Sequence, residues 1–332
     1  MTLFDSLILG GDIGGTKINL GLFKREGDHL TPVVEETFPS KDYAGLDQVL
    51  DRFLSGRQVS LASASFGVAS PIVDGHADAP NLHWRLAVED LRQKLKIPHV
   101  DLINDLEATA LAISALPEDS FAVLNAGGGK LHGDRAVIAA GTGLGEAALV
   151  WGGAGYRVIP SEGGHGDFAP RNALEIELLK YLLGKFERVS YERVLSGPGL
   201  HSIYMFLREY KHVPDPAWLT EQMSHDDPSS VITQTGLAGR DALCVEALEI
   251  FISVYGAEAG NLALKFFATG GVFIGGGIAP RILPKLKEDA FMKAFTDKGR
   301  LSTLLSSIPV RVILDPRAAL FGAAYHGLSL LQ

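Results

Sequence analysis

Asp105 is a candidate general base. It follows Asn104 at the point where an apolar strand, Val100–Ile103, gives way to an alanine-rich helix, Leu106–Leu116. A carboxylate at a helix N-terminus is kept ionised by the helix dipole and can accept a proton from a substrate hydroxyl. Asn104 and Glu107 also form a capping pair by their spacing. The sequence therefore leaves open whether Asp105 acts on a substrate, caps the helix or does both.

A second polar cluster lies among glycines, in the run Ser161-Glu162-Gly163-Gly164-His165-Gly166-Asp167. Glu162 offers an acceptor and His165 a donor or acceptor to a small polar ligand. A metal-binding pair is disfavoured because the HExxH spacing is absent and no cysteine is nearby. A polar surface loop without a ligand remains the alternative.

Glu192 is the third acidic candidate. The sequence predicts a short helix at Tyr191–Leu195 that is capped by Ser190 and ended by Gly197-Pro198. A glutamate in a first turn stabilises the helix dipole. Its position alone therefore does not require a ligand.

Glycine clusters follow apolar runs at three places. The first two lie 130 positions apart when Gly11-Asp12 is set on Gly141-Thr142, and both continue as strand-like sequence, which predicts one unit used twice. Strand ends without Cβ atoms allow a ligand to approach the backbone closely. The clusters are Gly10–Thr16 after Leu7–Leu9, Gly141–Gly145 after Val137–Ala140, and Gly275–Gly277 after Val272–Ile274.

The sequence after the first glycine cluster indicates a hairpin. Apolar residues alternate with polar or small ones after Thr16, which is a period of two. Dinucleotide-binding and GxxxxGK[ST] phosphate loops both continue as a helix, and the second motif is absent. Amides of a hairpin turn can still bind phosphate. A carboxylate in such a turn repels phosphate unless a divalent cation lies between them, so Asp12 is expected to steer Mg²⁺ through water. The alternative is that Asp12 is a turn aspartate that bonds local amides.

Composition excludes several classes of protein. The 332 residues are 46% hydrophobic and 21% charged, with a net charge of −9, which disfavours nucleic acid and anionic membranes as partners. The single cysteine, Cys244, excludes an internal disulfide. We find no basic, apolar leader at the N-terminus and no apolar run near the ~20 residues of a membrane span. A cytoplasmic protein with a small-molecule substrate is expected.

Strands and helices alternate along the chain, which predicts an α/β fold. A strand is expected at Leu61–Val68. Besides the elements already named, helices are expected at Val88–Lys96, Ala173–Leu183, within Asp241–Phe267 and at Ala318–Leu330.

Taken together, these segments resemble the bacterial-type glucokinases of the hexokinase, actin and Hsp70-like ATPase superfamily. Six motifs in one order, spread over essentially the whole chain, carry the resemblance: Gly11–Thr16, Ile103–Asp105, Gly141–Gly145, Glu162–His165, Glu192–Gly199 and Gly275–Ile278. It implies a two-lobed ribonuclease-H-like or actin-like ATPase fold, each lobe a mixed β-sheet flanked by helices, with an active-site cleft between the lobes. The small lobe would be residues 1–115 plus 316–332 and the large lobe 116–315, and a homodimer is implied.

The resemblance also implies a role for each motif. Glucose would be phosphorylated at its 6-hydroxyl by ATP, with Asp105 as the base and Mg²⁺ at Asp12. Asn104, Asp105, Glu162, His165 and Glu192 would bind the glucose. ATP would be held by Asp12, Gly14, Gly15, Thr16, Gly141, Thr142, Gly143, Gly276 and Gly277.

The chain also departs from related proteins. The ROK sugar kinases carry a cysteine-rich zinc motif after the histidine, whereas Asp167–Pro170 follows here, so we expect no zinc. Only ten residues precede Gly11, which disfavours a DNA-binding repressor. Another hexose, such as mannose or N-acetylmannosamine, a donor other than ATP, and a non-catalytic sugar sensor remain alternatives. Lys17 and Glu146, both beside the phosphate turns, receive no role.

Overall fold

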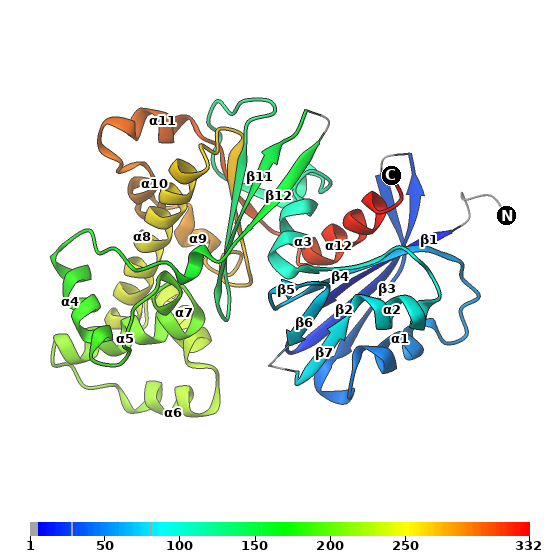
Figure 1. Cartoon of the computed structure of the whole chain (residues 1–332). Coiled ribbons are helices and arrows are strands. Elements are labelled where there is room, and N and C mark those ends of the chain that lie inside the picture. The colour runs from blue at the N-terminus through cyan, green and yellow to red at the C-terminus, as the bar shows by residue number, and fades with distance from the viewer. Residues whose placement is uncertain (1–5, 28, 80–81, 154) are drawn as a thin grey trace. The chain divides into compact units, whose positions relative to one another are not determined.

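The computed structural model describes residues 6–27, 29–79, 82–153 and 155–332, and the chain divides into two compact units (Figure 1). Unit 1 is Met1–Ser120, Tyr156–Val158 and Asp315–Gln332, and unit 2 is Phe121–Gly155 and Ile159–Leu314. Each unit contains a mixed β-sheet with helices packed against it. The expected α/β class, with two mixed sheets flanked by helices, is confirmed.

The main sheet of unit 1 has five strands in the order β3-β2-β1-β4-β8. Strand β2 is antiparallel to both of its neighbours, β3 and β1, whereas β1, β4 and β8 are parallel. Between β4 and β8 in the sequence, β5, β6 and β7 form a separate small antiparallel sheet. The strands are β1 (Leu7–Ile13), β2 (Lys17–Glu26), β3 (His29–Pro39), β4 (Leu61–Val68), β5 (Ile72–Val73), β6 (His76–Ala79), β7 (Trp84–Ala87) and β8 (Val100–Asn104).

Helices cover both faces of this sheet because its central strands are apolar on both sides. The neighbouring residues Ile8 and Leu9 are both buried and point to opposite faces. Leu9 belongs to the cluster formed with α1 (Leu46–Leu54) and α2 (Val88–Leu95). Ile8 belongs to the cluster formed with α12 (Ala318–Ser329), which packs on α3 (Asp105–Ala112). Figure 1 shows α12 in red beside α3.

The second main sheet has six strands in the order β12-β11-β10-β13-β14-β9, and it belongs to unit 2 except for Tyr156–Val158 at the start of β12. Its central strands β10, β13 and β14 are parallel, while β10 and β11 form an antiparallel hairpin. The strands are β9 (Phe121–Asn125), β10 (Arg135–Ala140), β11 (Leu144–Trp151), β12 (Tyr156–Ser161), β13 (Gly271–Gly275) and β14 (Val310–Ile313).

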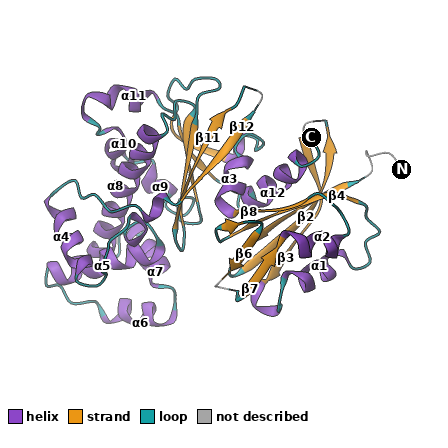
Figure 2. Ribbon diagram, in the orientation of Figure 1, coloured by secondary structure: helices purple, strands orange, loops and turns teal. Residues whose placement is uncertain are grey.

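A bundle of helices packs against the sheet of unit 2 (Figure 2). Helix α8 is buried along most of its length and contacts α5, α7, α10, β10 and β13. Among the described residues, none of the helices combines the length and apolar character that crossing a bilayer requires. The helices are α4 (Ala173–Leu183), α5 (Gly197–Tyr210), α6 (Ala217–His225), α7 (Pro228–Leu237), α8 (Ala242–Lys265), α9 (Leu283–Leu286), α10 (Asp289–Thr296) and α11 (Ser302–Ser307), and two short 3₁₀ turns are η4 (Gly163–His165) and η5 (Tyr191–Arg193).

Most of the helices expected from the sequence are present, and one is wrong. The helix at Ala173–Leu183 is confirmed with its predicted bounds. The expected helix at Tyr191–Leu195 is only a 3₁₀ turn, and Gly197-Pro198 begins α5 instead of ending a helix. The Oγ of Ser196 caps α5 by accepting the N–H of Gly199 at 3.0 Å. Proline suits a first helical turn because the amide that it lacks would have no partner there.

The two glycine hairpins are confirmed, but their offset differs from the expected one. Ile13 and Ala140 end the first strands, and Lys17 and Leu144 begin the second. Both pairs lie 127 positions apart rather than 130, since 140 minus 13 and 144 minus 17 agree. Asp12 therefore corresponds to Ala139 and not to Thr142, so the second hairpin has no acidic counterpart of Asp12.

Helix α12 tests how tightly unit 1 is packed. A Cβ atom at Gly322 would lie 1.6 Å from the carbonyl oxygen of Ala108 on α3. We predict that Gly322→Ala lowers the free energy of unfolding by about 1–3 kcal/mol or more, because rigid backbone must move to admit the methyl group. Gly128→Ala is the matched control, since nothing lies within 4 Å of a Cβ there. Urea unfolding measures both, and equal stabilities would contradict the packing.

Candidate functional site

The first glycine turn of unit 1 begins beside Asp12. Asp12 stands opposite Asn19 in the β1–β2 ladder, and the Asn19 amide donates to the Asp12 carboxylate at 2.9 Å. The Asn19 carbonyl in turn accepts the hydroxyl of Thr37 on β3 at 2.8 Å. The Asp12 side chain is therefore oriented by a chain of two hydrogen bonds across three strands.

Ser40 holds the turn that follows. Its N–H donates to the carbonyl of Thr16 at 3.1 Å, and its hydroxyl donates to the carbonyl of Gly14 at 2.8 Å. Gly15 and Thr16 remain exposed. Ser40 thus fixes the turn through two of its carbonyl groups, and the amides of exposed turns can bind anions.

The electrostatics of Asp12 fit a bound cation. Burial raises its pKa, while the hydrogen bond from Asn19 and the charge of Lys17 act in the opposite direction. Among the described residues there is no cluster of three His, Cys, Asp or Glu side chains able to hold a metal. Magnesium needs no such cluster, because it keeps several waters and is held by one or two carboxylates together with substrate phosphates. Asp12 fits this mode of binding.

Asn104 and Asp105 lie at the same edge of the sheet as Asp12. Asp12 pairs with Gly67 on β4, and Gly67 pairs with Ile103 on β8. Since these strands are parallel, their carboxyl ends meet at one edge. The last strand residue and the first helix residue there are Asn104 and Asp105.

Asn104 and Asp105 both accept hydrogen bonds at the start of α3. The Asn104 carbonyl caps α3 by accepting the N–H of Leu106 at 2.9 Å, and its amide donates to the carbonyl of Ser70 at 3.2 Å. The Glu107 carboxylate accepts the Asn104 N–H, which opposes the rise that burial gives its pKa. Asp105 occupies the first helical position, where one carboxylate oxygen also accepts the Leu106 N–H at 2.9 Å. Asn104 is therefore the N-cap of α3, and Asp105 shares the N–H of Leu106 with it.

In unit 2, the second and third glycine clusters meet at the carboxyl edge of β10 and β13. Gly276 has φ +81°, and a Cβ there would lie 2.2 Å from the carbonyl oxygen of Ala140. The N–H of Ile278 donates to the same carbonyl at 3.3 Å. The carbonyl of Gly141 accepts the N–H of Gly197, at the start of α5, at 2.8 Å. Gly141–Gly143 and Gly276–Gly277 are consequently joined through the end of one strand.

The hydroxyl of Tyr255 on α8 bonds the backbone at the ends of β10 and β13. Its hydroxyl accepts the N–H of Ala140 at 3.2 Å and lies 3.3 Å from the carbonyl oxygens of Ile138 and Gly275. The side chain is fully buried, which raises its pKa and keeps the hydroxyl protonated as a donor. Sequence reasoning missed Tyr255, Asn19 and Ser40, because only the tertiary contacts show where these ordinary helix, strand and loop residues point.

The expected sugar residues of unit 2 lie around β11. Glu162 and His165 flank the glycines of η4, which packs on β11, and both side chains are exposed. One oxygen of Glu192 accepts the N–H of Leu144 at 3.0 Å, directly after the second glycine turn. Its other oxygen lies 4.0 Å from Nδ1 of His165. The structure thus brings His165 and Glu192 together next to the expected phosphate turn.

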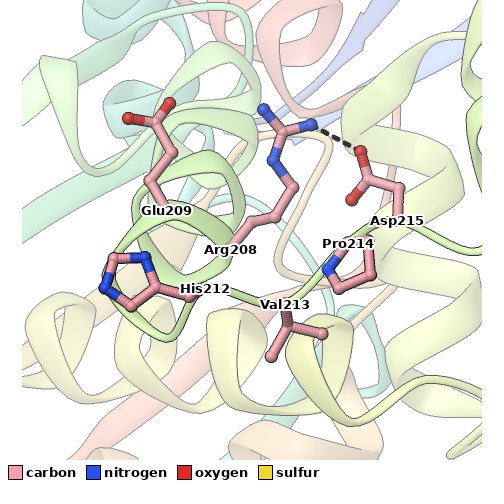
Figure 3. Close-up of a pocket in the computed structure, with 6 residues that line it drawn as sticks. All are labelled: Arg208, Glu209, His212, Val213, Pro214 and Asp215. Carbon is pink, nitrogen blue, oxygen red and sulfur yellow. Dashed lines mark hydrogen bonds and ion pairs between the residues drawn. The ribbon is translucent and has the colours of Figure 1, made fainter.

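A separate surface depression is not part of this site. It lies at the end of α5 and is lined by Arg208, Glu209, His212, Val213, Pro214 and Asp215 (Figure 3). Asp215 is bonded to Arg208 at 2.5 Å and to the hydroxyl of Tyr204 at 2.6 Å. The charges of Arg208 and Asp215 are thus already paired with each other.

Comparisons with known proteins decide the family. Residues 9–329 match the family described as glucokinase. The chain belongs to the glucokinase family. The glucokinase of Nostoc punctiforme is 43% identical over 334 residues, which cover 96% of this chain and 98% of that protein. The glucokinase of a Synechocystis species is 40% identical over 95% of this chain and 96% of its own.

Solved structures agree with this assignment to the glucokinases. A glucokinase from an Antarctic psychrotroph has a TM-score of 0.87 and 32% identity, covering 98% of this chain and 99% of that one. A ROK family glucokinase from Streptomyces griseus, solved in complex with glucose and AMPPNP, has a TM-score of 0.66 and 21% identity. The second likeness concerns the fold alone. The expected resemblance to glucokinases, with a fold shared by the ROK sugar kinases, is confirmed.

The packing of η4 on β11 can be tested at Gly164. A Cβ there would lie 2.0 Å from the carbonyl oxygen of Leu144, and backbone cannot yield as a side chain would. We predict that Gly164→Ala displaces the loop and raises the KM for glucose at least about tenfold. Gly155→Ala, where nothing lies within 4 Å of a Cβ, should leave the KM unchanged. An unaltered KM in a folded Gly164→Ala protein would show that the loop does not position glucose ligands.

Proposed function

We propose that the enzyme transfers the γ-phosphoryl group of ATP to the 6-hydroxyl of D-glucose, with Asp105 as the general base. The observation that carries this proposal is the position of Asp105. It lies at the N-terminus of α3, at the sheet edge it shares with Asp12, while Asn104 takes the capping role. Membership in the glucokinase family supports the substrate and the donor.

Asp105 would accept the proton of the 6-hydroxyl as the oxygen attacks phosphorus. The positive end of the α3 dipole and the N–H of Leu106 favour the ionised carboxylate before the reaction. General bases of this kind contribute about 10²- to 10⁴-fold to a rate. Phosphoryl transfer otherwise asks mainly for alignment and for neutralisation of charge.

The glycine turns would supply that alignment. The amides of Gly14 and Gly141 close their own turns by donating to the carbonyls of Lys17 and Gly143. The amides that follow them, at Gly15–Thr16 and at Thr142–Gly143, would donate to phosphate oxygens. Gly276 and Gly277 would lie under the adenosine. Magnesium, held by Asp12 through water, would neutralise phosphate charge when bound.

Four polar side chains would bind the remaining hydroxyls of glucose, namely Asn104, Glu162, His165 and Glu192. Each would accept or donate hydrogen bonds that a sugar of different stereochemistry leaves unmade. A polar group left unpaired in a desolvated site costs about 1–3 kcal/mol. Discrimination between epimers would follow from the sum of such losses.

The experiment that tests the activity is a coupled assay of purified protein with ATP and Mg²⁺. The panel comprises glucose, mannose, fructose, galactose and N-acetylmannosamine, and ADP and polyphosphate are tried as alternative donors. We expect the highest kcat/KM with glucose and ATP. A higher value for another hexose would assign the site to that sugar, and no turnover at all would support a sugar-binding sensor. Light scattering of the same sample tests the expected homodimer.

The role of Asp105 predicts a specific kinetic defect. Asp105→Asn should lower kcat by about 10²- to 10⁴-fold with little change in the KM for glucose, because the amide fills the same space but cannot accept the proton. Glu107→Gln is the matched control in the same helical turn, since glutamine retains the capping bond. Equal losses in the two variants would show that only the helix terminus matters.

The hydrogen bonds that link Asp12 to Asn19 and Asn19 to Thr37 predict a graded change in the Mg²⁺ concentration that the enzyme requires. Asp12→Ala should raise the Mg²⁺ concentration needed for half-maximal activity at least about tenfold, since the carboxylate is lost. Asn19→Ala should have a smaller effect of the same kind, because it removes only the bond that orients the carboxylate. Thr37→Val, one bond further away, is the control. Titrating Mg²⁺ at saturating ATP ranks the three variants by the Mg²⁺ concentration that each needs. A ranking other than Asp12→Ala above Asn19→Ala above Thr37→Val would contradict the role of these hydrogen bonds.

A further inference from the structure

Glu146 is a buried acid that the proposed mechanism does not use. It is the third residue of β11 and only 1% exposed. Its oxygen Oε1 has no hydrogen-bond partner. Burying an ionised carboxylate that lacks hydrogen bonds is strongly unfavourable, whereas a neutral carboxylic acid is tolerated far better. The surroundings of Glu146 therefore favour its protonated form.

The carboxyl group of Glu146 lies directly beneath the loop that carries the proposed glucose ligands. A Cβ at Gly163 would be 2.0 Å from Oε2 of Glu146, so the carboxyl group occupies the space that a side chain at 163 would need. The N–H of Gly163 donates to the Oγ of Ser161 at 2.9 Å, which ties this backbone to the end of β12, while η4 packs on β11. Glu162 precedes this contact in sequence and His165 follows it. The loop consequently rests on the carboxyl group of Glu146.

The charges around Glu146 come from α8. Glu258, with no exposed surface, accepts hydrogen bonds from Lys265 at 2.9 Å and from Asn261 at 2.7 Å. The cation of Lys265 is thus already paired. Burial raises the pKa of Glu146 to about 7, and the negative charge of Glu258 adds to the rise while Lys265 opposes it. Tyr255, also on α8, faces Glu146 as a neutral hydroxyl.

We propose, on the basis of the function proposed above, that Glu146 is a positioning residue for glucose. Its protonated carboxyl group supports the loop at Glu162–His165, and its ionisation loosens that loop by placing a second negative charge beside Glu258. Because glucose binding requires the loop in place, it favours the protonated form of Glu146. By linkage, glucose binding then takes up a proton at pH values where the free protein has lost it.

Isothermal calorimetry of glucose binding to the full chain, without ATP, tests this proposal. Titrations at pH 6 and pH 8 in buffers of different ionisation enthalpy give the number of protons taken up. We expect almost none at pH 6 and an uptake approaching about one proton at pH 8, with affinity falling up to about tenfold per pH unit above neutrality. Glu146→Gln, which stays neutral, should bind glucose within about threefold of the unaltered protein at pH 6 and keep that affinity at pH 8.

Controls separate Glu146 from other titrating groups. Glu162, His165 and Glu192 are present in both proteins, so the difference between them isolates Glu146. Glu175, a buried acid on α4, is paired with Arg171, which precedes the helix. Glu175→Gln should leave the proton uptake as it is in the unaltered protein.

Each outcome decides the proposal. Equal proton uptake by the unaltered protein and Glu146→Gln would overturn it, as would an affinity of the unaltered protein that is the same at pH 6 and pH 8. The second measurement needs no variant, so it stands even if Glu146→Gln does not fold. A protein that neither binds nor phosphorylates glucose would instead refute the proposed function. Normal turnover with pH-independent binding would refute the role of Glu146 alone.

Discussion

The arrangement depends on one constraint, which is that parallel strands end at a common edge. In unit 1 this edge collects Asp12 from β1 and Asn104-Asp105 from β8, although more than 90 residues separate them in sequence. In unit 2 the same rule brings the turn after β10 next to the glycines after β13. The antiparallel hairpins add a turn at each of these edges. In each unit, the candidate residues for a phosphorylated ligand therefore stand at strand ends.

The backbone of β10 shows how rigidly such an edge is held. Its last residue is Ala140. The N–H of Ala140 donates to the hydroxyl of Tyr255, and its carbonyl accepts the N–H of Ile278. Gly276 packs against the same carbonyl with no room for a side chain. Phosphoryl transfer gains most from groups that are already in place, because they need no reorganisation during the reaction. The buried contacts of β10 provide that rigidity.

In unit 2, buried charged groups gather on α8 near the loop at Glu162–His165. Glu258 is neutralised by Lys265 and bonded by Asn261, and the amine of Lys298 donates to Asn261 at 2.6 Å. Burial lowers the pKa of Lys298. A network of this kind is expensive unless every member is satisfied. Oε1 of Glu146 is the exception, and it lies directly beneath the residues proposed to bind glucose.

Local features could be read from the sequence because they depend on neighbours in the chain. The two-residue period after Thr16 determines a hairpin, the spacing of Asn104 and Glu107 determines a helix cap, and the apolar pattern determines the helix at Ala173–Leu183. The family follows from six motifs in order. Tertiary structure decided what depends on distant residues: that Asn19 orients Asp12, that Tyr255 fastens the ends of β10 and β13, and that Glu146 supports Gly163. It also decided that Gly197-Pro198 begins a helix, since the same two residues end or start a helix according to where the chain packs next.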